Sequence, residues 1–419
     1  MGLRKVVVTG FGSISPFGIG VPVLMENLEA GKSAVENMKL EWENTIEDLN
    51  SWVGAPVHTE LDEKSIPRKY RKTMGRSAIL ATLAVKEACQ DAKISEEQLG
   101  SGRAGVSFGS STGSVDSTEK FFNESFNNKS LRQISSGMFF QIMSHTAAAN
   151  IAQAFNITGR VVSANAACSS SAQAIGLGFE AIQNGTQDIM LCGGTDELHA
   201  MTTVSFDIVQ AASFKYNDRP EQTPRPFDQD RDGTVCGEGA GCIILESEES
   251  AKARGAKIYG EISGFATFSS GVHIAQPDQA SIEKCINFAL EQASIKTTGI
   301  DYINAHATGT LVGDVSEAKA IKEVFGDSVP VSGFKGYFGH TLGASAVLEL
   351  IASFKMLEEN KILPTKNLLD IDPECSGIFH VQKALSKKTK YFVKNSFAFG
   401  GINTVLIAKR NNHDRTGNI

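Results

Sequence analysis

Cys168 stands in the segment Ala-Asn-Ala-Ala-Cys-Ser-Ser-Ser-Ala-Gln, between the apolar pair at 161–162 and a helical pattern that begins near residue 169. The small residues on both sides would let a substrate and backbone amides approach the sulfur closely. A thiol at the start of a helix lies near the positive end of the helix dipole, which favours the thiolate. We therefore expect a nucleophile for acyl transfer, although a buried structural cysteine is the commoner role of this residue type.

Two histidines follow in turns that contain glycine. His306 comes at the end of a strand pattern at 302–305, and His340 precedes a helical pattern at 344–357. The carboxyl ends of strands are where α/β folds usually place their chemistry. A third motif, Asn-Ser-Phe-Ala-Phe-Gly-Gly at 395–401, is a strand that enters a tight glycine turn. The wide spacing leaves open whether these groups meet, and a single histidine more often has a structural role.

The same cysteine and histidines could also belong to a thiol hydrolase site or to a metal site. A cysteine paired with a histidine is also the arrangement of papain-like thiol hydrolases. That interpretation leaves the second histidine and the glycine turn at 399–401 without a role. A metal site is disfavoured, because no pair of histidines or cysteines has ligand spacing.

The composition narrows the classes of protein further. The chain has 419 residues, of which 41% are hydrophobic and 21% are charged, as expected for a globular protein. A net charge of −7 argues against general binding to nucleic acid. Seven cysteines without a Cys-X-X-Cys pair argue against a disulfide framework or structural zinc and favour the reducing cytoplasm. No apolar run reaches the roughly 18 residues of a membrane span, and no signal-peptide pattern is present.

Strand and helix patterns alternate along the chain, which predicts mainly parallel sheets covered by helices. Strands are predicted at 5–9, 104–108, 161–164, 188–193, 242–245, 258–265, 302–305, 329–332, 391–397 and 404–408. Helices are predicted at 21–30, 77–92, 144–155, 170–183, 281–293, 315–324 and 344–357. The pattern forms two cycles of similar order. We predict an N-terminal half (1–255) with the nucleophile, a C-terminal half (256–411) with both histidines, and a polar tail (412–419).

With these residues in view, the chain resembles the β-ketoacyl-acyl carrier protein synthases, and most of all the elongating type of this condensing-enzyme family. The similarity runs from about residue 5 to about residue 409. It is most specific at Arg-Pro-Phe-Asp-Gln-Asp-Arg-Asp-Gly (225–233) and at Gly-Glu-Gly-Ala-Gly (237–241). The resemblance implies the thiolase fold, in which two similar α/β halves stack as five α-β-α-β-α layers. It also implies a dimer with one active site per subunit.

The chemistry implied by the resemblance is a decarboxylative Claisen condensation. Cys168 would hold an acyl group as a thioester. His306 and His340 would bind the thioester carbonyl of malonyl-carrier and stabilise the enolate that forms as carbon dioxide leaves. Backbone N–H groups of Cys168 and Phe399 would form the oxyanion hole. No cofactor is implied beyond the phosphopantetheine arm of an acyl carrier protein.

The resemblance also assigns supporting residues. Lys335 joins the catalytic set and forms a buried pair with Glu349 that positions His340. Phe399 is a gate in front of the cysteine, next to Gly400. Asp314 and Glu317 would support the loop after His306. The acidic carrier protein would dock on a basic run made of Arg68, Lys69, Arg71 and Lys72. For this basic run, a solvated helix face is the ordinary alternative.

Departures from the family pattern gather around the expected pockets. Thr112 stands where elongating synthases commonly carry a branched apolar residue in the acyl pocket, and Gln173 stands where many have histidine. We therefore expect an unusual acyl group, such as the polar or conjugated chain of polyene or other polyketide synthesis. The partner would be a second copy of the chain or a chain-length factor.

Three rival functions remain. A non-enzymatic scaffold subunit would lack the nucleophile, which this chain has in Cys168. A coenzyme A-dependent thiolase is disfavoured, because the loop at 399–401 has no second cysteine and two histidines are present. An initiating synthase, with its Cys-His-Asn set, is disfavoured by His340 and Lys335.

Overall fold

The computed structural model describes residues 2–132 and 134–411, except the side chain of Asn128. The predicted polar tail at 412–419 lies outside the described residues. The central feature is a twelve-stranded sheet, in which β2 pairs only with β1 and the other strands follow the order β14-β12-β11-β16-β17-β10-β1-β9-β7-β5-β6. Strands from the first part of the chain are β1 (Val6–Ser15), β2 (Gly18–Ile19), β5 (Ala104–Gly109), β6 (Val161–Val162), β7 (Ile189–Asp196) and β9 (Gly239–Ser247). Those from the second part are β10 (Gly260–Ser269), β11 (Tyr302–Asn304), β12 (Pro330–Ser332), β14 (Phe379–His380), β16 (Tyr391–Ala398) and β17 (Ile402–Arg410).

The sheet is mixed, so the prediction of mainly parallel sheets is wrong. The strands near the middle pair antiparallel, from β7 through β9, β1, β10 and β17 to β16. Parallel pairs are confined to the two outer parts, where β5 pairs with β6 and β7, and β11 pairs with β12 and β16. The two halves meet where β1 and β10 pair over two residue positions. Buried strands have apolar sequences whatever their direction, which is why the pattern could not distinguish the two arrangements.

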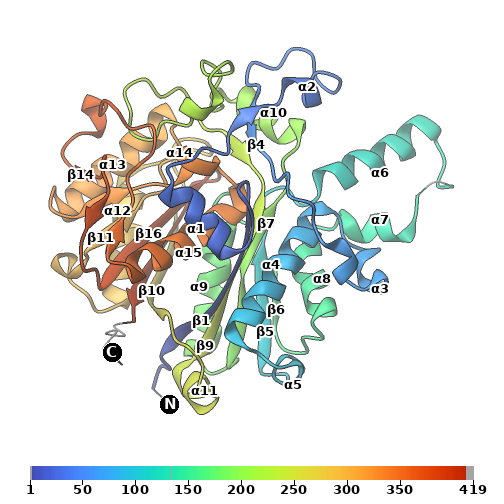
Figure 1. Cartoon of the computed structure of the whole chain (residues 1–419), viewed down its shortest axis with the longest axis horizontal. Helices are drawn as coiled ribbons and strands as arrows, with labels where there is room; N and C mark the ends of the chain where they lie inside the picture. Colours follow the sequence, from blue (N-terminus) through green and yellow to red (C-terminus); the bar gives the residue numbers. More distant parts are fainter. Residues whose placement is uncertain (1, 133, 412–419) are drawn as a thin grey trace.

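Helices cover both faces of the folded sheet and fill its interior, so the predicted five-layered arrangement is confirmed (Figure 1). In the middle layer, α9 (Ser170–Gln183) contacts β5 and β7 on one side and β10 and β17 on the other, and α15 (Ser345–Glu358) contacts β9 and β16. The outer layers hold α4 (Arg76–Ala92) and α8 (Thr146–Ala154) on one side and α12 (Gln279–Gln292) and α13 (Leu311–Phe325) on the other.

The small residues of α9 follow from its central position. A helix that is packed on every side must be apolar all round. At Gly176, an added Cβ would lie 2.1 Å from the ring of Phe265, and at Gly178 it would lie 2.2 Å from the sulfur of Cys192. These glycines therefore let both halves of the sheet approach the helix that begins beside Cys168.

Shorter elements complete the fold. Among the shorter helices are α1 (Val21–Glu29), α2 (Lys39–Trp42), α3 (Arg68–Arg71), α5 (Glu96–Leu99), α10 (Ala200–Ile208), α11 (Glu248–Ala253) and α14 (Lys335–Phe338). Two small sheets consist of β3 (Glu36–Asn37), β4 (Val53–Ala55) and β8 (Cys236–Gly237), and of β13 (Lys361–Ile362) and β15 (Leu385–Ser386).

Helices α6 (Val115–Asn128) and α7 (Ser136–Gln141) project from the body of the molecule, as Figure 1 shows. We call their described residues, 115–132 and 134–141, the arm. Its large apolar side chains are exposed: Phe122, Phe126, Leu131, Phe139 and Phe140. The sequence patterns did not predict either helix.

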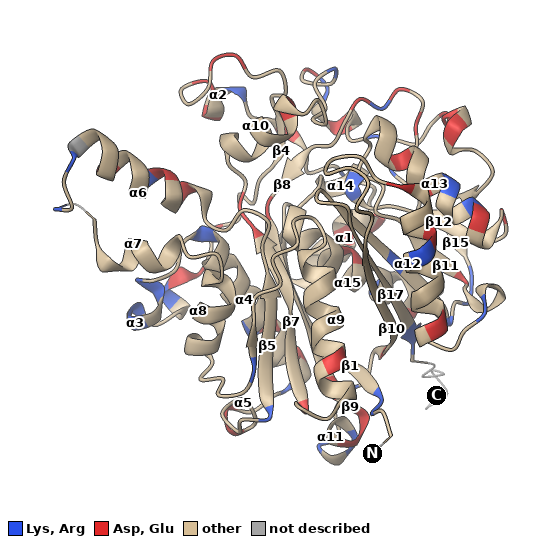
Figure 2. Ribbon diagram, turned by 180° about the vertical axis from the view of Figure 1, so that it is seen from behind, with Lys and Arg blue, Asp and Glu red and all other residues tan. Residues whose placement is uncertain are grey.

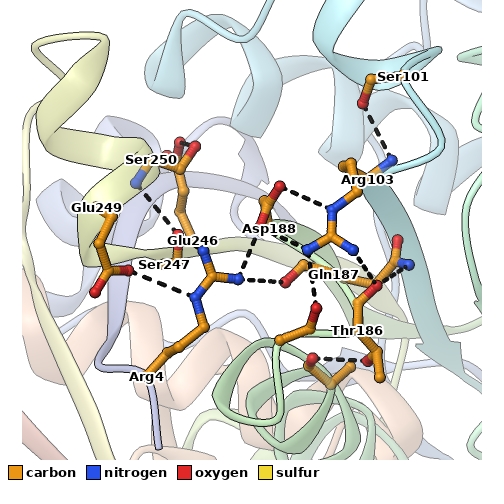
Figure 3. A network of polar contacts seen from close by, with 12 residues as sticks. Arg4, Ser101, Arg103, Thr186, Gln187, Asp188, Glu246, Ser247, Glu249 and Ser250 are labelled. Atoms are coloured by element: carbon orange, nitrogen blue, oxygen red, sulfur yellow. Dashed lines mark hydrogen bonds and ion pairs between the residues drawn. The ribbon is translucent and has the colours of Figure 1, made fainter. Parts of the chain in front are cut away.

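A network of charges lies at the end of the sheet near α11 and the N-terminus (Figure 3). Asp188 accepts hydrogen bonds from Arg4 at 2.8 Å and from two nitrogen atoms of Arg103 at 2.8 and 2.9 Å. Arg4 also pairs with Glu249 at 3.6 Å. The network joins the N-terminal segment, the start of β5 and α11. Helices α10 and α14 lie at the other end of the sheet (Figure 1).

Candidate active site

Cys168 lies in a tight turn directly before α9 and is only 6% exposed. The preceding residue, Ala167, has a φ of 47°, a left-handed conformation that is unfavourable for a side chain with a Cβ. The hydroxyl of Ser396 in β16 donates to the carbonyl of Cys168 at 3.2 Å, and the hydroxyl of Ser169 donates to the carbonyl of Ser396 at 3.0 Å. These two bonds fix the turn against the strand that leads to Phe399.

The expected thiolate is not the resting form of Cys168. Burial raises the pKa of its thiol to about 12, while the nearby charge of Lys335 acts in the opposite direction. The helix terminus alone led us to expect a thiolate, but the loss of water on burial costs the anion more than the charge of Lys335 returns. The thiol of Cys168 is therefore protonated at neutral pH in this structure.

His306 lies in the loop after β11, and the carboxylate of Glu317 binds the backbone of that loop. The backbone N–H groups of His306 and Ala307 donate to the two oxygens of Glu317 at 2.8 and 2.7 Å. Asp314 accepts from the N–H groups of Gly309 at 3.1 Å and Phe227 at 2.7 Å. Burial raises the pKa of Glu317, and it raises that of Asp314 to about 6. Both carboxyl groups thus contact the loop backbone that positions the imidazole.

His340 follows α14 and faces His306 across the site. Its N–H donates to the carbonyl of Val235 at 2.7 Å, and its carbonyl accepts from Gly237 at 2.9 Å. The two imidazole rings are 5.4 Å apart at an angle of 84°. Within the described part of the chain, neither ring nitrogen of His340 has a hydrogen-bond partner.

Both imidazoles are neutral. Burial, followed by the charge of Lys335, lowers the pKa of each histidine well below its usual value. A neutral imidazole carries one N–H, which can donate to a carbonyl oxygen without a change of charge in the protein. Two such donors that converge on one point can stabilise an oxyanion.

Behind the histidines lies a fully buried cluster of three charges. Glu349 pairs with Lys335 at 2.7 Å through one oxygen and with Lys394 through the other. The Lys335 ammonium also donates to the carbonyl of His306, whereas we expected the pair to act on His340. Burial lowers the pKa of Lys394 to about 8, despite the attraction of Glu349.

Lys394 was missed by the sequence interpretation. It lies in β16, one residue before the Asn-Ser-Phe motif, and its ammonium also donates to the carbonyl of Asn395 at 2.8 Å. The strand sequence Tyr-Phe-Val-Lys-Asn-Ser-Phe-Ala gave no clear signal for it, because a lysine beside other polar residues in a strand usually faces solvent.

A cavity of about 490 Å³ opens in front of the cysteine and the histidines. Phe399 stands at its mouth with 38% of its side chain exposed. Its ring is 5.6 Å from that of Phe206 in α10, which in turn is 6.5 Å from that of His340. Gly400 has a φ of 89°, and its N–H donates to Ile274, so it forms the turn of this loop. Phe206 was also missed, because α10 was not predicted.

The cavity brings many of the predicted site residues together. It is lined by Cys168, His306, His340, Asp314, Glu317 and Phe399. Lys335 and Glu349 lie behind the histidines with no exposed surface.

The predicted acyl-pocket residues lie elsewhere in the single chain. Thr112 is in an exposed turn just before α6, where its hydroxyl donates to Asp196 at 3.1 Å. Gln173 donates to Thr267 at 3.0 Å and does not line the cavity.

The predicted carrier-binding residues belong to α3 and the residue after it. Figure 2 shows α3, with blue segments on its ribbon, beside α8 and below α7. Arg68, Lys69 and Lys72 are exposed, whereas Arg71 donates to the carbonyl of Glu63 at 2.8 Å. The four residues do not line the cavity.

Residues 2–132 and 134–411 contain no group of three or more His, Cys, Asp or Glu side chains placed to hold a metal ion. None of their helices combines the length and the apolar character needed to cross a membrane.

Comparison with known families gives two matches that together span most of the chain. The family model "Beta-ketoacyl synthase, N-terminal domain" matches residues 3–251, and "Beta-ketoacyl synthase, C-terminal domain" matches residues 259–369. A curated relative from Haemophilus influenzae, 3-oxoacyl-[acyl-carrier-protein] synthase 1, is 36% identical over 98% of this chain and 100% of its own length. The synthase 2 of Staphylococcus aureus is 33% identical over 97% of this chain and 98% of its own.

Solved structures agree with these matches. A β-ketoacyl synthase from Burkholderia phymatum superposes with a TM-score of 0.94 at 39% identity, covering 97% of this chain and 100% of that one. A structure described as the ishigamide ketosynthase/chain length factor has a TM-score of 0.89 at 30% identity, covering 98% of this chain and 100% of that one.

Proposed function

The chain belongs to the β-ketoacyl synthase family, and we propose that it extends an acyl group held on Cys168 by decarboxylative condensation with a malonyl unit. Both substrates would arrive as thioesters on an acyl carrier protein. The observation that carries this proposal is the convergence of a thiol and two neutral imidazoles on one cavity. A thiol hydrolase would leave the second imidazole without a role.

The first half-reaction transfers the acyl group. The sulfur of Cys168 attacks the carbonyl carbon of the acyl thioester, and the carrier leaves as its free phosphopantetheine thiol. Because the resting thiol is protonated, its proton passes to the departing sulfur, so the transfer needs no permanent anion at the buried site. The hydrogen bonds that join Ser169 and Ser396 across the turn hold Cys168 near the Phe399 loop. This supports an oxyanion hole made from the backbone N–H groups of Cys168 and Phe399.

The second half-reaction forms the new carbon–carbon bond. The malonyl unit loses carbon dioxide, and the electron pair of the broken bond enters an enolate that is stabilised by N–H groups of His306 and His340. The carbanion carbon then attacks the acyl carbonyl on Cys168. The bond between the acyl carbonyl carbon and the sulfur of Cys168 then breaks, and β-ketoacyl-carrier is released. The sulfur leaves as the thiolate and takes up one proton from water to restore the thiol.

The role of the histidines can be tested separately from that of the cysteine. We expect His306→Ala and His340→Ala to lower the condensation rate by about 100-fold or more, while the rate of Cys168 acylation changes little. Product formation and acyl transfer would be followed by mass spectrometry of the carrier and of the protein. Condensation at the wild-type rate in both variants would contradict the proposal.

The arm and strand β6 support assembly with a second subunit. Strand β6 is an edge of the sheet with Val161 47% exposed, and the arm exposes five large apolar side chains. Unpaired strand edges and contiguous apolar surfaces are typical of interfaces. A second copy of this chain is the proposed partner, and a chain-length factor is the alternative because such a partner occurs in a similar structure. A subunit over the turn before α6 would also bury Thr112, as an acyl-pocket role requires.

Sedimentation of the purified chain shows whether it forms a dimer with itself or stays monomeric without another subunit. The wild type should sediment as a dimer, and Phe126→Glu combined with Phe139→Glu should yield a monomer. Phe214→Glu is the control, because Phe214 is also an exposed phenylalanine but lies outside the arm. A wild type that remains monomeric by itself would contradict the homodimer.

The basic run on α3 remains the proposed docking site for the carrier. The exposure of Arg68, Lys69 and Lys72 supports it. Reversing these charges should raise KM for the carrier-bound substrates, whereas Lys252→Glu on α11, at the other end of the sheet, should not. Equal effects of the two changes would refute the assignment.

The acyl group is proposed to be polar or conjugated. The support is the polar character of Thr112 and Gln173, both of which would lie near an acyl chain only in an assembled enzyme. Turnover of saturated and polyunsaturated acyl-carriers of equal length can be compared directly. Equal or better use of the saturated chain would overturn this proposal.

A further inference from the structure

Thr234 lines the same cavity as Cys168 and both histidines, but it has no part in the two half-reactions proposed for them. It is fully buried, and its hydroxyl has no hydrogen-bond partner within the described part of the chain. Among the residues that line the cavity, this property is shared only by the ring nitrogens of His340 and the hydroxyl of Ser270. A buried polar group without a partner is costly, which points to a ligand that completes it.

The backbone fixes Thr234 beside His340. Its N–H donates to the carbonyl of Ala211 at 2.8 Å, and its carbonyl accepts from Ser213 at 2.8 Å. The next residue, Val235, accepts the N–H of His340. Hydrogen bonds thus fix the backbone of Thr234 on both sides. Its neighbour Val235 binds the backbone N–H of His340, which positions the imidazole.

The other hydroxyls of the cavity have different surroundings. Thr308 and Thr310 form a hydrogen bond with each other at 3.0 Å. Ser270 lies against the turn at Gly401, on the side of the Phe399 loop. Thr234 is therefore the lining hydroxyl that is both unpartnered and adjacent to His340.

The charge of the cavity indicates what this hydroxyl would bind. The described lining contains no lysine or arginine, and His306 and His340 are neutral. Its three carboxyl groups already accept hydrogen bonds within the protein: Asp278 from Ser281, Asp314 from Phe227 and Gly309, and Glu317 from His306 and Ala307. The substrate that must enter carries a carboxylate on the carbon next to the thioester carbonyl. With the carbonyl oxygen on the two imidazoles, the carboxylate needs its own donor close to His340.

We infer that the hydroxyl of Thr234 donates a hydrogen bond to the carboxylate of the malonyl unit; the inference rests on the proposed function and identifies a specificity residue within it. A neutral donor orients the carboxylate without the strong attraction of a cation, which would oppose the loss of its charge. When the bond between the carboxylate carbon and C2 breaks, carbon dioxide leaves and its electron pair enters the enolate. Thr234 transfers no proton in this step.

Valine and serine substitutions test the inference. Thr234→Val keeps the shape of the side chain and removes the hydroxyl, whereas Thr234→Ser keeps the hydroxyl. We expect Thr234→Val to raise KM for malonyl-carrier about tenfold, as loss of a hydrogen bond to a charged group predicts, with a much smaller change in kcat. Thr234→Ser should stay within about twofold of the wild type. Acylation of Cys168 by acyl-carrier should be unchanged in both variants.

The outcomes separate this inference from the proposed function. An unchanged KM for malonyl-carrier in Thr234→Val, or an equal loss of acylation and condensation, would overturn the role of Thr234. Thr234→Ala provides the same comparison should the valine variant fail to fold. A wild type that acylates but forms no β-ketoacyl product would instead refute the proposed function.

Discussion

Two clusters in this molecule have the same arrangement, a carboxylate between two cations, but one lies at the surface and the other is fully buried. Asp188 lies between Arg4 and Arg103, and its side chain is 28% exposed (Figure 3). Glu349 lies between Lys335 and Lys394, and all three of these side chains are 0% exposed. The first cluster joins strand ends at the surface, whereas the second stands behind the proposed catalytic histidines.

The pKa shifts show which force dominates in each place. Hydrogen bonds from Arg103, which outweigh partial burial, lower the pKa of Asp188 to about 2. In the second cluster, burial outweighs the attraction of Glu349 and lowers the pKa of Lys394 to about 8. Buried ion pairs recover their desolvation cost only with excellent geometry. The inner cluster is therefore better explained by its contact with the His306 loop than by stability.

Breaking the inner cluster at its centre should have the largest effect on stability. Glu349→Gln leaves two buried ammonium groups without a counter-ion, so we expect a loss of about 3–5 kcal/mol in the free energy of unfolding. Urea denaturation would measure it. Adding Lys394→Met to Glu349→Gln should restore part of the loss, because it removes one uncompensated charge. A Glu349→Gln variant as stable as the wild type would show that the lysines are neutral in the folded protein.

Removing only Lys394 should have a smaller effect that depends on pH. Because the pKa of Lys394 is lower in the folded than in the unfolded protein, between pH 8 and 10.5 the unfolded chain binds more protons. The contribution of this group to the free energy of unfolding therefore rises with pH across that interval. The wild type should gain stability relative to Lys394→Met between pH 8 and 10.5, and parallel curves for the two proteins would contradict the shift.

The surface cluster should give the smallest effect. Asp188→Asn is expected to lower the free energy of unfolding by about 1 kcal/mol or less, because water and salt screen exposed ion pairs. The difference from the wild type should shrink further in 1 M salt. A loss as large as that of Glu349→Gln would remove the contrast between the two clusters.

The sequence predicted the residues of the candidate active site better than their surroundings. The motifs around Cys168, His306 and His340 identified groups that do share one cavity. Lys394 could not be found by periodicity, because a lysine in a strand usually marks a solvent-facing position. The direction of the central strands was also predicted wrongly, since buried strands are apolar whether they run parallel or antiparallel.

The missed helices have a physical reason as well. Helix α6 has an apolar face, but Phe122 and Phe126 on it are exposed instead of packed on the core. Helix α10 buries few of its residues, so its weak pattern hid Phe206 and its contact with the gate. A hydrophobic pattern indicates which helices pack on the core. Much of the surface of α6 and of α10 lies outside that core.

The most direct test of the central claim is an intact-mass measurement of the protein after exposure to an acyl-carrier. The account predicts a mass increase of one acyl group per chain in the wild type and none in Cys168→Ala. An absent adduct on the wild type, or an adduct that survives in Cys168→Ala, would contradict the assignment of Cys168 as the acyl-bearing nucleophile.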